Sequence, residues 1–420
     1  MIDRKKLVRA LDRRGVSDWV LLHHDQELAV AGGEPELRRT EHRTIWNLTV
    51  HHDTPQGRGT AHIALDANER DADEIVEQAL ALAVSSVGPG WSSPPLAAPA
   101  RVEVADASLA DRDLLDAATK LAHAVPKLDG ASAIATARLL REKVSATARG
   151  GLKREWPATS VRVDTVVRSQ QASLSVRREA RRVADLDLDA AIRSAADDLV
   201  LLPQGSAAVP GPCALVLRAE ALLFGGLGVW QAFVSQADAV VERQGLTRYR
   251  ERAAIAPGAD QIAEPLTIRS NGAVDHGLES APMSDDGGAI RAFTLVDKGM
   301  ASGLGLSPRE AALRKREPNG GVRNVVVDVG SWDGAIDPKG GRTIEVKRLR
   351  SMTIDPYTGD ASLELALSID HPLRTAFVGG AVRLDLIAAL AKARRSKAKL
   401  DRGAYSGPDA VYVAKVELIA

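Results

Sequence analysis

The pattern of hydrophobic and polar residues predicts two similar sets of elements in the first half of the chain. Apolar residues three and four positions apart predict amphipathic helices over residues 3–13, 71–86, 110–125 and 187–202. Between the first two helices, DWVLLHHD, ELRRTEHRTIWNLTVHHD and RGTAHIALD predict strands, and between the last two, ASAIATARLL, EKVSATAR, TSVRVDTVVRS and QASLSVRREARRV do. The order helix, strand meander, helix therefore occurs twice, and we expect two like-built halves, residues 1–87 and 103–202.

Short β-like runs separated by turns fill the second half of the chain. The turns are SNGAVDHG, SDDGG, EPNGG, DPKGG and DPYTGD, which are rich in the residues that turns favour. One late helix is predicted over residues 383–397. With a linker at PQGSAAVPGP, residues 203–212, the pattern predicts a two-domain α+β fold. Its parts are an amino-terminal α+β domain, residues 1–202, and a β-rich carboxy-terminal domain, residues 213–420. A Pro/Gly/Ser-rich stretch at 88–99 predicts a connector.

Residues 215–233, LVLRAEALLFGGLGVWQAF, combine a strand with an unusual helix. The first residues alternate like a strand that begins near Cys213, and the rest has apolar residues at helical spacing. Three glycines, Gly225, Gly226 and Gly228, lie within this predicted helix, and each costs about 1 kcal/mol relative to alanine there. We expect that they allow a strand, a partner or a substrate to pack closely on the helix, with ordinary core packing as the alternative.

Composition excludes several classes of protein. Lys+Arg and Asp+Glu are equal at 55 each, so binding to DNA or anionic membranes by bulk charge is not expected. Aromatic residues are only 3%, so the cores depend on Ala, Val, Leu and Ile. The single cysteine fits a reducing compartment. With neither a signal-peptide pattern nor an apolar run of membrane-spanning length, we expect a cytoplasmic protein.

Candidate metal ligands and nucleophiles are sparse. HHD occurs at residues 23–25 and 51–53, but adjacent residues on a strand point to opposite faces, so we expect solvated strand ends rather than a zinc site. Cys213 begins an apolar strand and is expected to be buried and inert. GGLG at 225–228 lacks the ending of a phosphate-binding loop.

Charged motifs also favour ordinary roles. The basic runs RREARR (177–182) and KARRSKAKLDR (392–402) lack the aromatic residues of a single-strand binder and predict solvated faces or helix-end charges. Asp285 and Asp286 precede two glycines, so we expect a turn in which Asp binds its own backbone rather than a catalytic dyad. From the residues alone, no complete catalytic constellation emerges.

Several blocks of the second half have a distinctive order and spacing. They are the glycine-containing helix, ESAPMSDDGGAIRAFTLVDKGMASGLGLSPREAA (279–312), EPNGGVRNVVVDVGS (317–331), VKRLRSMTIDPYTGDASLELALSI (346–369) and YSGPDAVYVAKVEL (405–418). With these blocks the carboxy-terminal half resembles the TldD/PmbA (TldE) family, whereas the amino-terminal half is compatible in pattern but has little specific signature. The resemblance implies a two-domain fold and a dimer around an internal chamber.

The resemblance also implies which chemistry this chain lacks. The TldD-type subunit of that family is a zinc peptidase whose HExxxH motif lies where this chain has LLFGGLGV. Phe224 and Val229 then stand at the two histidine positions and Gly225 at the glutamate, and no cysteine ligand is present around 404–407. Phe and Val cannot bind zinc, and Gly cannot act as a base. The chain is similar to the PmbA/TldE-type subunit, with no cofactor of its own and zinc expected in a partner.

The resemblance leads to a functional hypothesis with two alternatives. The leading hypothesis is a non-catalytic subunit that pairs with a HExxxH-bearing TldD-type subunit and completes a chamber for unfolded or precursor peptides. The alternatives are a catalytically inactive homodimeric peptide-binding protein and, with less support, a nucleic-acid-associated regulator. The candidate contacts with substrate or partner are Gly225, Gly226, Gly228, Asp285, Asp286, Asn319 and Arg323.

Overall fold

A computed structural model describes residues 3–65, 71–93, 100–337 and 340–420. It contains 23% helix and 41% strand with a β-rich carboxy-terminal region, so the predicted α+β class is confirmed. Part of the predicted connector, residues 94–99, lies outside the described residues. No helix among the residues described is both long and apolar enough to cross a membrane.

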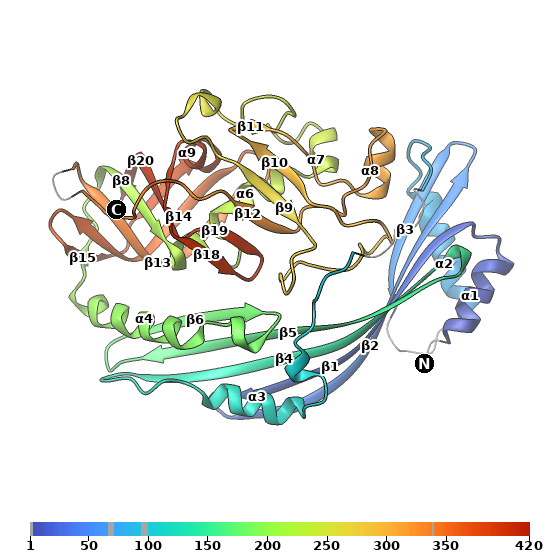
Figure 1. Cartoon of the computed structure of the whole chain (residues 1–420), viewed down its shortest axis with the longest axis horizontal. Helices are drawn as coiled ribbons and strands as arrows, with labels where there is room; N and C mark the ends of the chain where they lie inside the picture. The colour runs from blue at the N-terminus through green and yellow to red at the C-terminus, as the bar shows by residue number, and fades with distance from the viewer. Residues whose placement is uncertain (1–2, 66–70, 94–99, 338–339) are drawn as a thin grey trace.

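The amino-terminal half forms one long six-stranded antiparallel sheet with four helices (Figure 1). Its strands, in spatial order, are β3 (Gly57–Leu65), β2 (Leu37–Thr54), β1 (Asp18–Gly32), β4 (Ser132–Ala148), β5 (Leu152–Arg168) and β6 (Ser173–Ala180). Its helices are α1 (Arg4–Arg13), α2 (Ala72–Ser85), α3 (Leu114–His123) and α4 (Leu188–Leu201). β1 and β4 pair at the centre, so both sets of elements share a single sheet. The runs ASAIATARLL and EKVSATAR are one strand, β4, and their separation in our prediction was wrong.

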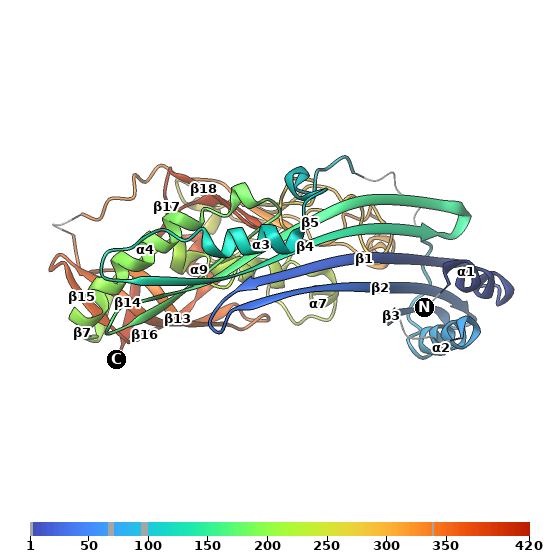
Figure 2. The same cartoon turned by 90° about the horizontal axis from the view of Figure 1, so that it is seen from below.

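The two faces of this sheet have different coverings. On β1, Trp19 and Leu21 pack with α1 and α2, and Ala29 and Ala31 pack with α3 (Figure 2). We call this side the helix face. Residues of opposite parity, such as Val20, point the other way, because side chains alternate along a strand. We call this second side the inner face, and it contacts the carboxy-terminal half.

The carboxy-terminal half contains two further sheets and short helices. One sheet has the order β11 (Met300–Ala301), β10 (Phe293–Asp297), β9 (Ile268–Asn271), β12 (Asn324–Val327), β19 (Tyr405–Pro408), β18 (Lys399–Arg402). The other has the order β13 (Thr343–Ile354), β8 (Gly211–Arg218), β20 (Ala410–Ile419), β16 (Ala381–Asp385), β14 (Asp360–His371), β15 (Thr375–Val378), β7 (Ser206–Ala207), and β17 (Arg394–Arg395) pairs with β20. The helices are α5 (Ala219–Leu222), α6 (Gln231–Gln236), α7 (Ala239–Arg243), α8 (Pro308–Leu313) and α9 (Leu386–Ala391). One core, which includes Leu215, Trp230 and Val325, draws residues from both sheets.

Two stretches differ in detail from the predicted elements. The predicted helix 383–397 is only α9, because Asp385 ends β16 and caps the helix, and Arg394 and Arg395 return to strand pairing. Residues 203–212, treated as a linker, contain β7, which pairs with β15, and the first residues of β8.

Candidate functional site

The helix predicted within residues 215–233 is broken in its middle. Helix α5 ends at Leu222, and helical structure resumes with a single turn at Gly228 before α6. Gly225, Gly226 and Gly228 have φ angles of +72°, +119° and +56°. Glycine adopts such angles far more readily than other residues, so these glycines turn the chain between two short helices. The prediction of a continuous helix was wrong.

The three glycines differ in the space around them. A Cβ atom on Gly225 or Gly226 would have no neighbour within 4 Å, and both residues are exposed. A Cβ atom on Gly228 would lie 1.8 Å from the carbonyl oxygen of Leu222. The close approach at Gly228 therefore occurs within the chain itself.

The residues at the positions of the HExxxH ligands do not fit a zinc ion. Val229 is fully buried in the carboxy-terminal core, and Phe224 packs against the same core. Neither side chain has a nitrogen, oxygen or sulfur atom, and Gly225 has no side chain. In β19, where a cysteine ligand would fall, Tyr405 is buried and stacks on Trp230. Within the described ranges, no three His, Cys, Asp or Glu residues are grouped so that they could hold a metal.

Directly before the glycine segment, Glu220 binds three arginines from distant parts of the chain. The distances to its carboxylate are 2.5 Å from Arg178 in β6, 3.0 Å from Arg402 in β18 and 3.3 Å from Arg348 in β13. Burial would raise the pKa of Glu220, but these arginines outweigh it and lower the pKa to about 2. Arg348 also binds Asp198 of α4 at 2.7 Å. This charge cluster ties α5 to both halves of the molecule.

The basic runs are only partly solvated: Arg177, Lys392, Arg394, Lys397 and Lys399 are exposed, as predicted, but Arg178, Arg181 and Arg395 bind inside the fold. In the first run, Arg178 joins the charge cluster, and buried Arg181 donates to the carbonyl oxygens of Leu278 and Ser280. In the second, Arg395 is 2% exposed and donates to the carbonyl oxygens of Asp328 and Glu264. Acceptors inside the fold bind these three arginines.

The first HHD motif lies in the middle of β1, so the prediction of a strand end was wrong there, whereas the second lies at the end of β2 with Asp53 exposed and His51 buried. His23 stacks on Trp46 on the helix face, with 4.0 Å between ring centroids. On the inner face, His24 contacts Glu142 at 3.2 Å. His51 is 6% exposed and lies 3.0 Å from the hydroxyl of Thr60. The histidines of each pair therefore point apart, as the strand period requires.

Cys213 is buried in β8, as predicted. Burial raises the pKa of its thiol, which keeps the thiol in the protonated form. A nucleophilic role has no support from this environment.

A cavity of about 220 Å³ lies where the inner face meets the carboxy-terminal half. Its lining residues are His51, Thr60, His62, Ser86, Trp91, Asp286, Ser307, Pro308 and Arg309. We call it the junction cavity. The β2–β3 hairpin supplies two histidines and a threonine, residues 86–91 supply a second wall, and the turn before β10 and the start of α8 supply the third. Of the candidate residues predicted from sequence, Asp286 lies in this lining.

The segment 284–288 directs Asp286 toward the cavity. Ser284, rather than an aspartate, makes the turn: its hydroxyl accepts from the N–H of Gly288 at 3.0 Å, and its carbonyl oxygen accepts from Gly287. Gly287 has a φ of +75°, as its turn role predicts, but the aspartates do not bind the turn backbone. Burial raises the pKa of Asp286, Asp285 raises it further, and His62 and Arg323 lower it. Asp285 is exposed.

Two other predicted contacts, Asn319 and Arg323, support the same region from behind. Asn319 is buried, donates to the carbonyl oxygen of Leu304 at 2.8 Å and accepts from the N–H of Leu306 at 2.7 Å. Arg323 donates to the carbonyl oxygen of Gly320 at 3.0 Å. Asn319 thus holds loops together, while Arg323 acts on Asp286 electrostatically. The glycine segment does not contribute to the junction cavity.

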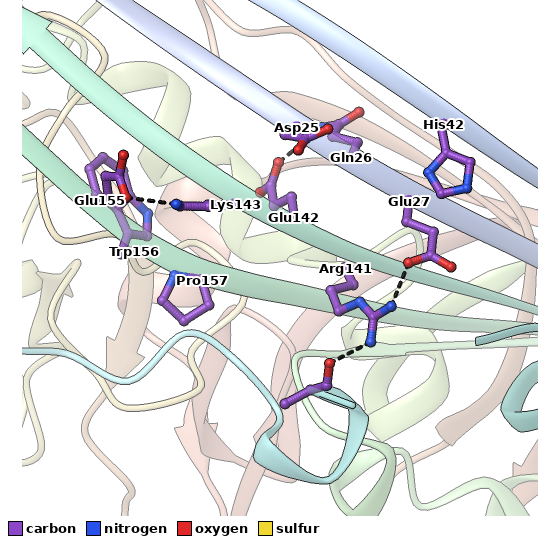
Figure 3. A pocket seen from close by; sticks show the side chains of 11 residues that line it. Asp25, Gln26, Glu27, His42, Arg141, Glu142, Lys143, Glu155, Trp156 and Pro157 are labelled. Carbon is purple, nitrogen blue, oxygen red and sulfur yellow. Dashed lines mark hydrogen bonds and ion pairs between the residues drawn. The ribbon is translucent and has the colours of Figure 1, made fainter. Parts of the chain in front are cut away.

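A larger hollow of about 450 Å³ is lined by residues of β1, β2, β4 and β5 and by Ala110 (Figure 3). Its charged residues are mostly paired with each other: Arg141 binds Glu27 at 2.5 Å and Lys143 binds Glu155 at 2.7 Å. Arg141 also donates to the carbonyl oxygen of Ala110. Because these charged side chains pair with one another, the hollow gives no indication of a ligand site. The pattern of the sequence did not point to either cavity, since both form between distant segments.

Known proteins share this architecture. The family model of the PmbA/TldA metallopeptidase C-terminal domain matches residues 229–382. A search of curated protein sequences gave no match. Three crystal structures share the fold over essentially the whole chain. A candidate modulator of DNA gyrase from Bacteroides thetaiotaomicron has a TM-score of 0.78 and 13% identity, with 100% of each chain covered. A second candidate gyrase modulator, from Thermotoga maritima, has a TM-score of 0.76 and 15% identity, with 99% of each chain covered. TldE from Thermococcus kodakarensis has a TM-score of 0.74 and 15% identity, with 99% of this chain and 100% of that chain covered.

Proposed function

The chain belongs to the TldD/PmbA family through its carboxy-terminal domain, and on that premise we propose that it is the non-catalytic, TldE/PmbA-like subunit of a TldD/TldE-type zinc metallopeptidase. It pairs with a HExxxH-bearing TldD-type subunit in the cytoplasm. The zinc ion belongs to that partner. This chain completes the chamber in which an unfolded or precursor peptide is held for cleavage or maturation.

The observation that carries the proposal is the segment at the position of the metal helix. Three properties of this segment oppose catalysis by this chain: Phe224 and Val229 lack donor atoms, Gly225 lacks a base, and the helix itself is interrupted. A zinc peptidase needs three protein ligands held in fixed geometry and a base beside the metal-bound water. Restoring these would require new side chains and a different backbone. The chain therefore contributes shape and contacts rather than the reacting groups.

The charge cluster supports a role as a rigid wall of the chamber. Glu220, Arg178 and Arg348 connect the long sheet to the carboxy-terminal sheets through buried ion pairs, which are costly to break. Strand β6 and helix α4 of the amino-terminal half are thereby held against the carboxy-terminal half. A fixed wall of this kind suits a subunit that positions an extended chain.

Reconstitution with a HExxxH-bearing homologue tests the proposal. The purified chain, soaked in zinc and dialysed, is expected to hold no stoichiometric metal and to leave unfolded peptides intact. Addition of the homologue is expected to give a complex that cleaves peptides and loses this activity with a chelator. A homologue with the motif glutamate changed to glutamine controls for contaminating proteases.

Two results would contradict the proposal. Tight stoichiometric zinc in the chain alone, or chelator-sensitive cleavage by it alone, would show that this chain has a catalytic site of its own. A stable dimer of the chain that binds peptides and ignores the homologue would favour the homodimeric peptide-binding protein instead. Light scattering of the chain and of the mixture separates these assemblies.

A further inference from the structure

Arg309 lies in the lining of the junction cavity and has no anionic partner among the described residues. No carboxylate among the residues described lies within ion-pair distance of Arg309, and its Nε is buried without a hydrogen-bond partner. The neighbouring Arg314 also has a buried Nε without a partner, but its guanidinium binds Glu242 at 2.8 Å, and Arg243 binds Glu310 at 3.2 Å. Arg309 is therefore set apart by its missing carboxylate, and a partly buried cation without a counter-charge is costly.

Gly88 makes room for this guanidinium. A Cβ atom at Gly88 would lie 2.2 Å from Nη2 of Arg309, although the backbone at Gly88 has no left-handed φ that would require glycine. The position of Gly88 is fixed, since its N–H and C=O both bond to the backbone of Arg58 at 3.1 Å. Glycine here therefore serves the approach of Arg309 to the wall of residues 86–91.

The same wall carries a second unsatisfied donor. Trp91 is 9% exposed, and its Nε1–H has no hydrogen-bond partner. Its ring meets His51 edge-on, at 4.9 Å between centroids, and the guanidinium of Arg58 lies 4.7 Å from the ring centroid on a face of the indole. The indole is thus held in place while its donor is unused. The buried Nε1–H groups of Trp19, Trp46 and Trp230 also lack a partner, so the donor of Trp91 is distinguished by its place in the cavity lining.

Asp286 supplies a carboxylate to the same lining, on the wall that also carries Arg309. Among the described residues no ion pair joins Asp286 to Arg309, so the cavity offers a carboxylate and a guanidinium that are not paired with each other. Its 220 Å³ holds about seven waters at ~30 Å³ each, which is enough for one amino-acid residue.

We propose that the junction cavity binds the carboxyl-terminal residue of a peptide, with Arg309 receiving the terminal carboxylate. The planar guanidinium matches a carboxylate in two-point geometry, and the indole N–H of Trp91 adds a donor. Asp286 accepts from a main-chain N–H of the same residue. This inference deepens the proposed function, on which it rests, because it assigns the chain a preference for free peptide ends.

Binding of three matched peptides tests the assignment. A fluorescein-labelled hexapeptide with a free carboxyl terminus, its amidated form, and an amidated form ending in glutamate are titrated against the full chain, alone and with the HExxxH-bearing homologue. The free terminus is expected to bind at least about tenfold more tightly than the amidated form, which corresponds to about 1.4 kcal/mol. Arg309→Gln is expected to remove this preference while leaving the amidated peptide unchanged.

Two further variants make the test specific. Gly88→Ala keeps the charge but displaces the guanidinium, so it is expected to reduce the preference as Arg309→Gln does. Arg291→Gln is the control, because Arg291 is an exposed arginine that pairs with Glu317 outside the cavity. Circular dichroism confirms that each variant is folded.

Each possible result of the binding experiment bears on the carboxylate site. Equal binding of the free and amidated peptides, or a preference that survives Arg309→Gln, overturns the carboxylate site while leaving the proposed function intact. Tight binding of the amidated peptide ending in glutamate shows that any carboxylate suffices and overturns the assignment to the chain terminus. Failure of every peptide to bind the chain or the complex overturns the proposed function and this site together.

Discussion

Replacement of Gly228 by alanine tests the internal role of the glycine segment. Gly228 has a φ of +56°, and a left-handed conformation costs a non-glycine residue roughly 1–2 kcal/mol. The new Cβ would lie 1.8 Å from the carbonyl oxygen of Leu222 and 2.6 Å from the Cα of Leu223. Both obstacles are backbone, so the chain must shift, and overpacking of this kind costs about 1–3 kcal/mol. We expect a total destabilisation of about 2–5 kcal/mol, against a gain of roughly 1 kcal/mol if the site were an open helix position.

Gly225→Ala is the matched control for this experiment. Gly225 also has a positive φ, +72°, but a Cβ there meets nothing within 4 Å, so only the conformational cost of roughly 1–2 kcal/mol remains. Thermal unfolding of the isolated chain, followed by circular dichroism and by tryptophan fluorescence, compares the two variants. Trp230 lies two residues from Gly228 and is fully buried, so its emission reports on this region.

The expected result is a clearly lower melting temperature for Gly228→Ala than for Gly225→Ala. Equal melting temperatures, or a Gly228→Ala variant as stable as the unmodified chain, would refute the conclusion that the crowding is internal. If stability held and only association with the homologue fell, the close contact at Gly228 would be with a partner. The bulkier Gly228→Leu should follow the same order with a larger loss.

Two further predictions concern buried charges. Glu220→Gln leaves Arg178, Arg348 and Arg402 without their shared carboxylate, and we expect a loss of about 3–5 kcal/mol in thermal or denaturant unfolding. Asp73→Asn, in an exposed pair that solvent screens, should change the stability much less. Similar small effects for both variants would contradict the role of the charge cluster. Burial lowers the pKa of His51 from 6.5 to about 4, so the folded state favours the neutral ring. The contribution of His51 to stability is therefore fully present above pH 6.5, and about 3 kcal/mol is lost as the pH falls toward 4. His51→Asn should flatten the dependence of stability on pH in this window. An unchanged profile in that variant would show that another group titrates there.

Local patterns in the sequence were enough to predict the elements and the class of fold. Alternation marked β1, β2 and β5, and helical spacing with acidic first turns marked α2, because these signals depend only on which face of an element is buried. The α+β class and the family resemblance followed from the same local information. The burial of Cys213 was also predictable, since it begins an apolar strand.

Contacts between residues that are far apart in the sequence determine the candidate site. The arginines of RREARR resemble a solvated run until α5 brings Glu220 to Arg178, because burial of a charge depends on a partner that lies 42 residues away in the chain. The glycine segment had helical spacing, yet the tertiary structure uses positive φ angles there and places Gly228 against Leu222. The junction cavity forms where β2, β3, residues 86–91 and α8 meet, so no single stretch contains its pattern. Sequence specifies periodicity and chemistry residue by residue, whereas cavities and ion clusters are products of packing between segments.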